Sequence, residues 1–226
     1  MIWRIKFFQK NSLNIMRANN EKKFLKIIFK KLRNLKSWII FLFKVHIQST
    51  RKLDVGSSGI NWGKGWILTD IELLDITCES NWFRLFSGIR LTNIMAEHVW
   101  EHLTESDTFL ANKNCHKFLK PGGVLRIAVP DGYHPDKSYI QWVKVGGNGP
   151  GADDHKILYN YIIMKRNLEK AGFRINLIEY WDENGKFHQT DWSHEAGFIR
   201  RSKNYDERNS SGELKYTSLI VDAIKI

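Results

Sequence analysis

From Lys52 to the C-terminus, short apolar runs alternate with segments that have the periodicity of amphipathic helices. This alternation restricts the fold more than any other feature, because it is typical of an α/β domain whose strands are joined by helical crossovers. We therefore predict a Rossmann-like, doubly wound sheet of about seven strands, mostly parallel with an antiparallel last strand, plus a basic N-terminal helix. The predicted strands are Lys52–Val55, Trp66–Asp70, Leu73–Ile76, Leu91–Ala96, Val124–Val129, Phe173–Tyr180 and Tyr216–Ile224.

Two helices are predicted from the signals at their ends. Thr104, followed by Asp107, resembles a capping box, and the helix that it begins stops before Pro121-Gly122-Gly123. A second helix is predicted over about His155–Ala171, because its apolar residues share one face and a glycine follows it. Between the last two predicted strands, residues 181–215 are rich in charge, glycine and aromatic side chains. A connection this long inside a compact domain is usually functional or disordered.

The positive charge of the chain is concentrated at its N-terminus. The formal net charge is +11, yet residues 1–52 alone hold 14 Lys and Arg against one acidic residue, Glu21. The rest of the chain has a net charge of −2. We divide the chain into a basic amphipathic extension, 1–51, and a folded domain, 52–226. Nucleic acid is not predicted as a partner, because the folded domain is close to neutral.

Within the extension, residues 21–47 have the period of an amphipathic helix. Apolar positions recur every three or four residues, and basic side chains occupy much of the rest. Such a helix suits an anionic membrane surface, because apolar burial and lysine attraction act together. Packing against another helix or its own domain, or an extension without fixed structure, stay open as alternatives. The apolar positions are Leu25, Ile28, Leu32, Leu35, Ile39 and Leu42.

The cellular setting is predicted from what the sequence lacks. No apolar run approaches the roughly 18–20 residues that a membrane-spanning helix needs. The two cysteines, Cys78 and Cys115, are far apart in the sequence, which argues against a disulfide framework and against a cysteine-built zinc site. We expect a cytoplasmic protein, peripheral at the membrane if the extension binds there.

Glycines and polar residues follow the predicted strands. In a doubly wound sheet, ligands bind beyond the carboxyl ends of the strands, where the strand order reverses. Gly56-Ser57-Ser58-Gly59 allows close approach of backbone to a ligand, and Asp70 suits ribose hydroxyls. Neither a P-loop nor a G-x-G-x-x-G motif is present, which argues against a phosphate-binding turn. Other residues at strand ends are Ile71, Asp75, Glu97, His98 and Asp131-Gly132-Tyr133-His134.

The order of these segments resembles class I S-adenosylmethionine-dependent methyltransferases, and most closely a bacterial branch of predicted methyltransferases. The resemblance covers roughly residues 52–226 and implies S-adenosyl-L-methionine as the cofactor. It departs from the family pattern at Ser58, where glycine is commoner, and in the short connection after the first strand. The stretches that carry it are Leu53–Gly59 (LDVGSSG) followed by Gly65–Asp70 (GWILTD), Ala96–Leu103 (AEHVWEHL) and Lys120–Asp131 (KPGGVLRIAVPD).

The resemblance also implies which positions bind the cofactor. The glycine turn surrounds the methionine part of the cofactor, and the acid after the second strand binds its ribose. An acid after the third predicted strand lies near adenine. The residues after the fourth predicted strand lie along the methyl side of the cofactor. Carried over by position, these residues are Gly56, Ser57 and Gly59; Asp70 with Ile71; Asp75; and Glu97 with His98.

Catalysis and acceptor binding are assigned to other strand ends and loops. A methyl sulfonium is already activated, so the protein mainly holds the acceptor in line, and a general base adds rate when the acceptor is a hydroxyl. Asp131, His134 and His98 are the candidate catalytic residues. We expect O-methylation of a polar, small-molecule or glycan-like acceptor, because tryptophan with carboxylates suits sugars and arginine suits anions. The predicted acceptor residues are His155, Asn160, Trp181, Asp182 and Arg201, and no metal is predicted.

Two other functions are weighed against this one. Residues 98–102 spell H-x-x-E-H, the motif of a family of zinc peptidases, but that chemistry needs all five residues inside one helix. Because a buried strand is predicted to end at Ala96, His98 falls in a turn, and we rank the zinc hydrolase last. A non-catalytic binding protein that retains the methyltransferase fold is the main alternative, in view of Ser58 and the short first connection.

Overall fold

The computed structural model describes residues 26, 32, 35–57 and 65–226, and it divides the chain into two units, 1–43 and 44–226. In the first unit, residues 35–42 are helical, as the apolar period of the basic extension predicts. Leu25 and Ile28 of the apolar stripe lie outside the described residues, and binding of the extension to a membrane stays a prediction. In the described part of the chain, no helix is long and apolar enough to cross a membrane.

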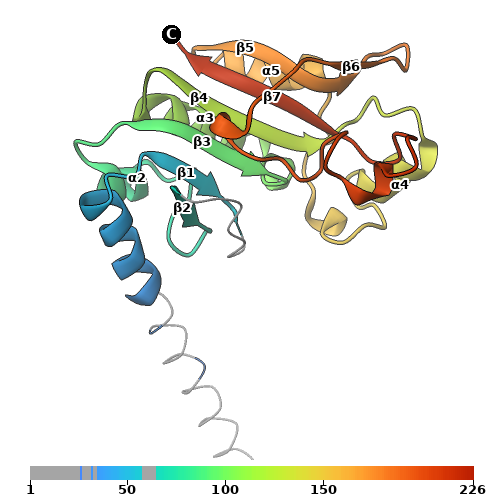
Figure 1. Cartoon of the computed structure of the whole chain (residues 1–226). Helices are drawn as coiled ribbons and strands as arrows, with labels where there is room; N and C mark the ends of the chain where they lie inside the picture. The colour runs from blue at the N-terminus through green and yellow to red at the C-terminus, as the bar shows by residue number, and fades with distance from the viewer. Residues whose placement is uncertain (1–25, 27–31, 33–34, 58–64) are drawn as a thin grey trace, which may run out of the picture. The chain divides into compact units, whose positions relative to one another are not determined.

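In the described part of the second unit, seven strands form one mixed sheet in the order β2-β1-β3-β4-β7-β5-β6 (Figure 1). Strands β2, β1, β3 and β4 are parallel, while β7 runs antiparallel to both β4 and β5, and β6 antiparallel to β5. The predicted fold class is confirmed. The strands are β1 Lys52–Val55, β2 Trp66–Thr69, β3 Leu91–Glu97, β4 Leu119–Pro130, β5 Phe173–Trp181, β6 Phe187–Gln189 and β7 Ser218–Lys225.

The helices begin where their capping residues stand. Thr104 accepts the backbone N–H of Asp107 and caps α3, which confirms the predicted capping box. Helix α3 contacts both α2 and α5 beside the sheet (Figure 1). The helices are α2 Glu79–Phe86, α3 Glu105–Phe118, α4 Lys137–Val143 and α5 Tyr161–Glu169. Short helical turns are η1 Phe43–Ile47, η2 Trp100–His102, η3 Ala152–Asp154, η4 His194–Ala196 and η5 Glu207–Asn209.

The strand order reverses at β1. From β1 the chain forms β2 on one side and then crosses to β3 on the other. Val55, the last residue of β1, pairs with Thr69 of β2 and with Ala96 of β3. The next residue of each strand therefore lies at the same level of the sheet edge, which is where a doubly wound sheet binds its ligand.

One predicted strand is wrong and two others begin at different residues. Strand β4 begins at Leu119 and not at Val124, and β7 begins at Ser218 and not at Tyr216. Residues 73–76 form no strand, because the Asp70 carbonyl accepts the N–H groups of Leu73 and Leu74 and turns the chain. Leu74 and Ile76 are buried, so their apolar pattern reflects burial rather than strand pairing. The second predicted helix begins at Tyr161 and not at His155. Helices α2 and α4 and strand β6 were not predicted.

The long segment after β6 is fastened to the sheet by a buried arginine. Arg126 of β4 is 2% exposed, and its guanidinium forms a bidentate ion pair with Asp222 of β7, at 2.7 Å for both contacts. The same guanidinium donates to the carbonyls of Ser193 and Gly197 at 2.8 and 2.7 Å. Arg126 thereby joins two strands to the segment that follows β6.

Candidate functional site

The turn after β1 is held tightly against β2 and β3. Gly56 has φ +70, and a Cβ at this position would lie 2.5 Å from a methyl carbon of Val99. Ser57 is buried, and its N–H donates to the Thr69 carbonyl at 3.1 Å. Only glycine combines this left-handed backbone with so close an approach. The third predicted residue of the turn, Gly59, lies outside the described residues.

A buried carboxylate lies just before this turn. Asp54 is 3% exposed, and its Oδ2 makes no hydrogen bond. Burial and the nearby negative charge of Glu97 raise the pKa of Asp54 to about 7. A carboxylate so placed, without a cationic partner among the described residues, favours a ligand that brings positive charge.

The acidic residues after β2 divide into an exposed one and a structural one. Asp70 is exposed directly after the strand, and its Oδ1 accepts the N–H of Glu72 at 3.1 Å. Ile71 is 76% exposed beside it. Asp75 instead accepts both the N–H and the hydroxyl of Thr77, at 3.0 and 2.7 Å, and so closes its own turn. Asp70 and Ile71 are therefore accessible to a ligand, whereas Asp75 orders the backbone before α2.

Glu97 and His98 end β3 in different roles. The Glu97 carboxylate accepts the N–H groups of Arg200 and Arg201, at 3.2 and 2.8 Å, and holds that segment to the sheet edge. His98 has φ +57, a conformation that few residues other than glycine adopt. Its Nε2 lies 3.2 Å from Ser218 Oγ, and its Nδ1 lies 3.0 Å from a carboxylate oxygen of Glu101. The strained turn aims the imidazole between β7 and η2.

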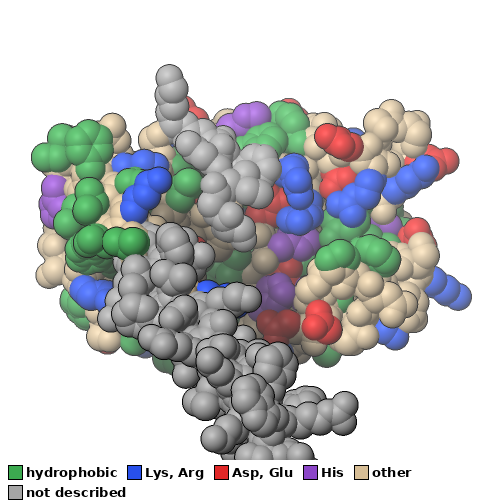
Figure 2. Space-filling model, turned by 90° about the horizontal axis from the view of Figure 1, so that it is seen from below, with side chains coloured by type: hydrophobic (Ala, Val, Ile, Leu, Met, Phe, Trp, Pro, Cys, Tyr) green, Lys and Arg blue, Asp and Glu red, His purple; other side chains and the backbone are tan. Residues whose placement is uncertain are grey.

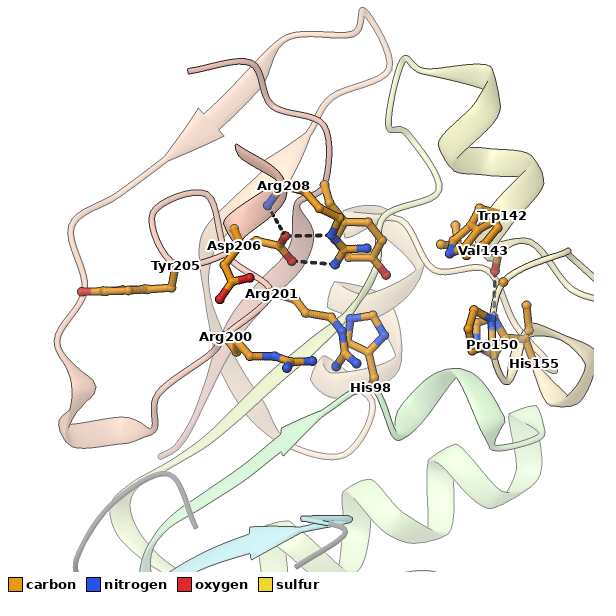
Figure 3. A pocket seen from close by; sticks show the side chains of 14 residues that line it. His98, Trp142, Val143, Pro150, His155, Arg200, Arg201, Tyr205, Asp206 and Arg208 are labelled. Atoms are coloured by element: carbon orange, nitrogen blue, oxygen red, sulfur yellow. Dashed lines mark hydrogen bonds and ion pairs between the residues drawn. The ribbon is translucent and has the colours of Figure 1, made fainter. Parts of the chain in front are cut away.

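A cavity of about 410 Å³ opens beside His98 (Figure 3). Its wall comes from the end of β3, from α4, from the segment around η3 and from the chain that leads to β7 (Figure 3). It contains three arginines, two histidines and three large aromatic side chains. The lining residues are His98, Trp142, Val143, Gly149, Pro150, Ala152, His155, Arg200, Arg201, Tyr205, Asp206, Glu207, Arg208 and Tyr216.

The arginines of the cavity are oriented by carboxylates and an aromatic ring. Arg208 forms a bidentate ion pair with Asp206, at 2.8 and 2.6 Å, and its guanidinium carbon lies 3.4 Å from the ring centroid of Tyr216. Arg201 Nη1 lies 3.4 Å from Glu97. Figure 2 shows basic, acidic and histidine side chains close together on one face of the molecule. Oriented guanidinium groups of this kind bind carboxylate or phosphate.

Two of the five predicted acceptor residues, His155 and Arg201, line the cavity, and the other three have structural roles. Asn160 caps α5 by accepting the N–H of Ile163. Trp181 is 9% exposed and donates to Thr217 Oγ1, while Asp182 orders the turn between β5 and β6. Tyr205, Asp206, Trp142 and Tyr216 were missed, because no local pattern marks them as neighbours of His98.

Asp131 and His134 do not line this cavity. Asp131 is fully buried, and its carboxylate oxygens accept the N–H groups of Tyr133 and Trp181, at 3.0 and 2.8 Å. Burial raises the pKa of Asp131 to about 6. His134 is stacked on Tyr139 at 4.0 Å between ring centroids, and burial lowers its pKa, which favours the neutral imidazole. Both residues join the end of β4 to its surroundings, and of the three predicted catalytic residues His98 alone reaches the cavity.

The arrangement that a zinc peptidase needs is absent from residues 98–102. His98 is left-handed, and the residues after it form the 3₁₀ turn η2 rather than an α-helix. His98 and His102 therefore do not share one helical face, as the peptidase motif requires.

No protein-family model and no curated protein matches this sequence. Among solved structures, the chain is similar to a SAM-dependent methyltransferase from Archaeoglobus fulgidus (17% identity, 83% of this chain and 93% of that chain, TM-score 0.43). It is also similar to a SAM-dependent methyltransferase from Thermotoga maritima (9% identity, 88% and 96% coverage, TM-score 0.45). A third is magnesium protoporphyrin IX methyltransferase from Synechocystis with bound SAH (9%, 86% and 84%, TM-score 0.40). The identities and TM-scores are low, so the fold is assigned from the strand order and register of this chain.

Proposed function

We propose that this chain is an S-adenosylmethionine-dependent methyltransferase that acts on a polar, anionic acceptor. The observation that carries the proposal is the register of the sheet at its switch point. Val55 pairs with both Thr69 and Ala96, so Gly56, Asp70 and Glu97 lie at one level, at the ends of three adjacent strands. A glycine turn beside an exposed acid at this place suits an adenosyl ligand, and the sequence resemblance points the same way.

The charges at the switch point fit this cofactor. S-adenosylmethionine carries a cationic sulfonium and an ammonium group, and it supplies an activated methyl group when bound. Asp54 offers a buried carboxylate oxygen without a hydrogen-bond partner, close to the negative charge of Glu97. A cationic ligand would compensate the buried carboxylate of Asp54, whose ionised form is disfavoured by burial and by the charge of Glu97. Asp70 would accept hydrogen bonds from ribose.

The cavity beside His98 supports an anionic acceptor. Arg200, Arg201 and Arg208 line it, and Tyr216 supports the Arg208 guanidinium. Arginine forks orient carboxylate or phosphate groups, so a hydroxylated acceptor that also carries one of these groups suits the cavity best. His98 lines the same cavity, and its Nε2, which lies 3.2 Å from Ser218 Oγ, is the nitrogen that would take a proton from such a hydroxyl.

The proposal is tested by calorimetry with S-adenosylhomocysteine. We expect micromolar binding to the full chain, weakened at least tenfold by Asp70→Ala, because a hydrogen-bonded ribose loses its charged acceptor. Asp191→Ala removes another exposed carboxylate, far from β2 in the sequence, and should leave the affinity unchanged. Absence of binding to the wild type, or equal losses in the two variants, would overturn the proposal.

A further inference from the structure

The 3₁₀ turn η2 and the segment that follows η3 are joined by backbone hydrogen bonds. The carbonyl of Glu101 accepts the N–H groups of Lys156 and Ile157, at 2.7 and 3.3 Å. These bonds bring His155 beside His102, and their ring centroids lie 4.9 Å apart in an edge-to-face arrangement. Three residues of metal-ligating types, from two distant parts of the sequence, thus meet at one place.

Glu101, His102 and His155 each offer one ligand atom, and these atoms lie within 4.8 Å of one another. Glu101 is 1% exposed, and neither of its carboxylate oxygens makes a hydrogen bond. His98 Nδ1 lies 3.0 Å from Glu101 Oε1, within ion-pair distance but without hydrogen-bond geometry. A buried carboxylate in this state is costly to the fold unless a cation compensates it.

Each of the two histidines makes a second contact through its Nδ1. His155 Nδ1 lies 2.7 Å from the Val143 carbonyl, and because a carbonyl only accepts, Nδ1 carries the proton. His102 Nδ1 lies 3.2 Å from Asp154 Oδ2, a carboxylate that likewise holds a proton at Nδ1. Each ring is left with Nε2 as its free lone pair. Histidines that bind metals are held in this way by a carbonyl or a carboxylate.

We propose that Glu101, His102 and His155 bind one divalent transition-metal ion of the zinc class. Two imidazoles and one carboxylate are a donor set that zinc uses in proteins, with water or a ligand oxygen completing the coordination. This set differs from the H-x-x-E-H set, because it uses His155 in place of His98. His155 also lines the arginine-containing cavity, so the ion lies at the cavity wall. The inference does not depend on the proposed methyl transfer.

The test uses the full chain, stripped with a chelator and dialysed, and titrated with ZnCl₂ by calorimetry. Bound metal is counted by elemental analysis. We expect about one zinc per chain, with a dissociation constant in the micromolar range or below. Glu101→Gln and His155→Ala should each weaken binding at least tenfold. His188→Ala should leave it unchanged, although His188 is also paired with a carboxylate, Asp182 at 2.7 Å.

Because Glu101 is buried, its variant is checked for folding by circular dichroism. Asp154→Asn provides a test that does not disturb the core, since the Asp154 side chain is 63% exposed. Loss of its charge should lower zinc affinity about tenfold by loosening His102. A wild-type chain that binds no zinc, or binding that survives in Glu101→Gln, His155→Ala and Asp154→Asn alike, would overturn the proposal. Binding of S-adenosylhomocysteine to the same preparations reports separately on the methyltransferase proposal.

Discussion

At the scale of single residues, Asp54 is the most informative position in the chain. It is an acidic residue of β1, between the parallel strands β2 and β3, and it is buried and close to a second acid. Such a position lowers stability unless a ligand or a proton compensates it. The raised pKa of Asp54 therefore couples the stability of the fold to pH.

We predict that Asp54→Asn flattens the pH dependence of unfolding. The folded pKa of Asp54, about 7, is above its ordinary value of 3.8, so its protonated form is favoured by the fold. The contribution of Asp54 to the free energy of unfolding of the wild type therefore decreases as pH rises from about 4 to 7. The amide of the variant cannot ionise, so this decrease is absent there. Between pH 4 and pH 8, the free energy of unfolding of the variant should increase by about 1–4 kcal/mol relative to that of the wild type.

Urea denaturation at several pH values measures this difference. Asp131, whose pKa is raised to about 6, contributes a decrease of the same sign in both proteins and leaves the comparison unaffected. Parallel stability curves for the wild type and the variant would contradict the account of Asp54.

Gly56 is predicted to tolerate no side chain. A Cβ would meet Val99 at 2.5 Å, in addition to the strain of φ +70. Gly88 has nearly the same φ, +73, with no atom within 4 Å of the added Cβ, so Gly88→Ala measures the backbone strain alone. We expect Gly88→Ala to cost about 1 kcal/mol and Gly56→Ala to cost about 2–4 kcal/mol. Thermal unfolding measures both variants. Equal losses of stability in Gly56→Ala and Gly88→Ala would show that the contact with Val99 is easily relieved.

At the scale of secondary-structure elements, the buried Arg126 joins β4, β7 and the segment after β6. Arg126→Met keeps the apolar stem, but it leaves Asp222 without its bidentate partner, and Asp222 is 14% exposed at the side chain. We expect a loss of about 3–5 kcal/mol, because one half of a nearly buried ion pair remains uncompensated. Lys165→Ala removes an exposed pair with Glu169 in α5 and should change stability by about 0.5 kcal/mol or less. Chemical denaturation of both variants measures their free energies of unfolding. Comparable losses of stability in the two variants would argue against this role of Arg126.

The elements predicted correctly are those whose signal is local. Strands β1 to β4 are apolar runs that end in polar residues, and Thr104 with Asp107 is a signal contained in four residues. The prediction failed where a local turn or a tertiary contact, and not the apolar pattern, decided the structure. Residues 73–76 have a strand-like pattern, but the turn at Asp70 leaves no neighbouring strand for them. The helix predicted from His155 begins later, at Tyr161, because Asn160 caps it there, while the N–H groups of Lys156 and Ile157 bind the distant Glu101 carbonyl.

At the scale of the whole molecule, the sequence located the edge of the sheet that carries the candidate site. This was possible because topology alone brings the ends of β1, β2 and β3 together. The sequence did not predict the partners of these residues. Glu97, which is predicted at the cofactor, also binds the backbone of Arg200 and Arg201, and Asp131, which is predicted in catalysis, also accepts the N–H of Trp181. Both contacts join residues that are far apart in the sequence, and no local spacing encodes them.

The central claim is that the ends of β1, β2 and β3 form the binding site for S-adenosylmethionine. A crystal structure of the protein soaked with S-adenosylhomocysteine tests it most directly. The account predicts ribose at Asp70, the amino acid part against the turn at Gly56, and the sulfur facing the cavity beside His98. A ligand bound anywhere else on the chain, or crystals that take up none at saturating concentration, would contradict it.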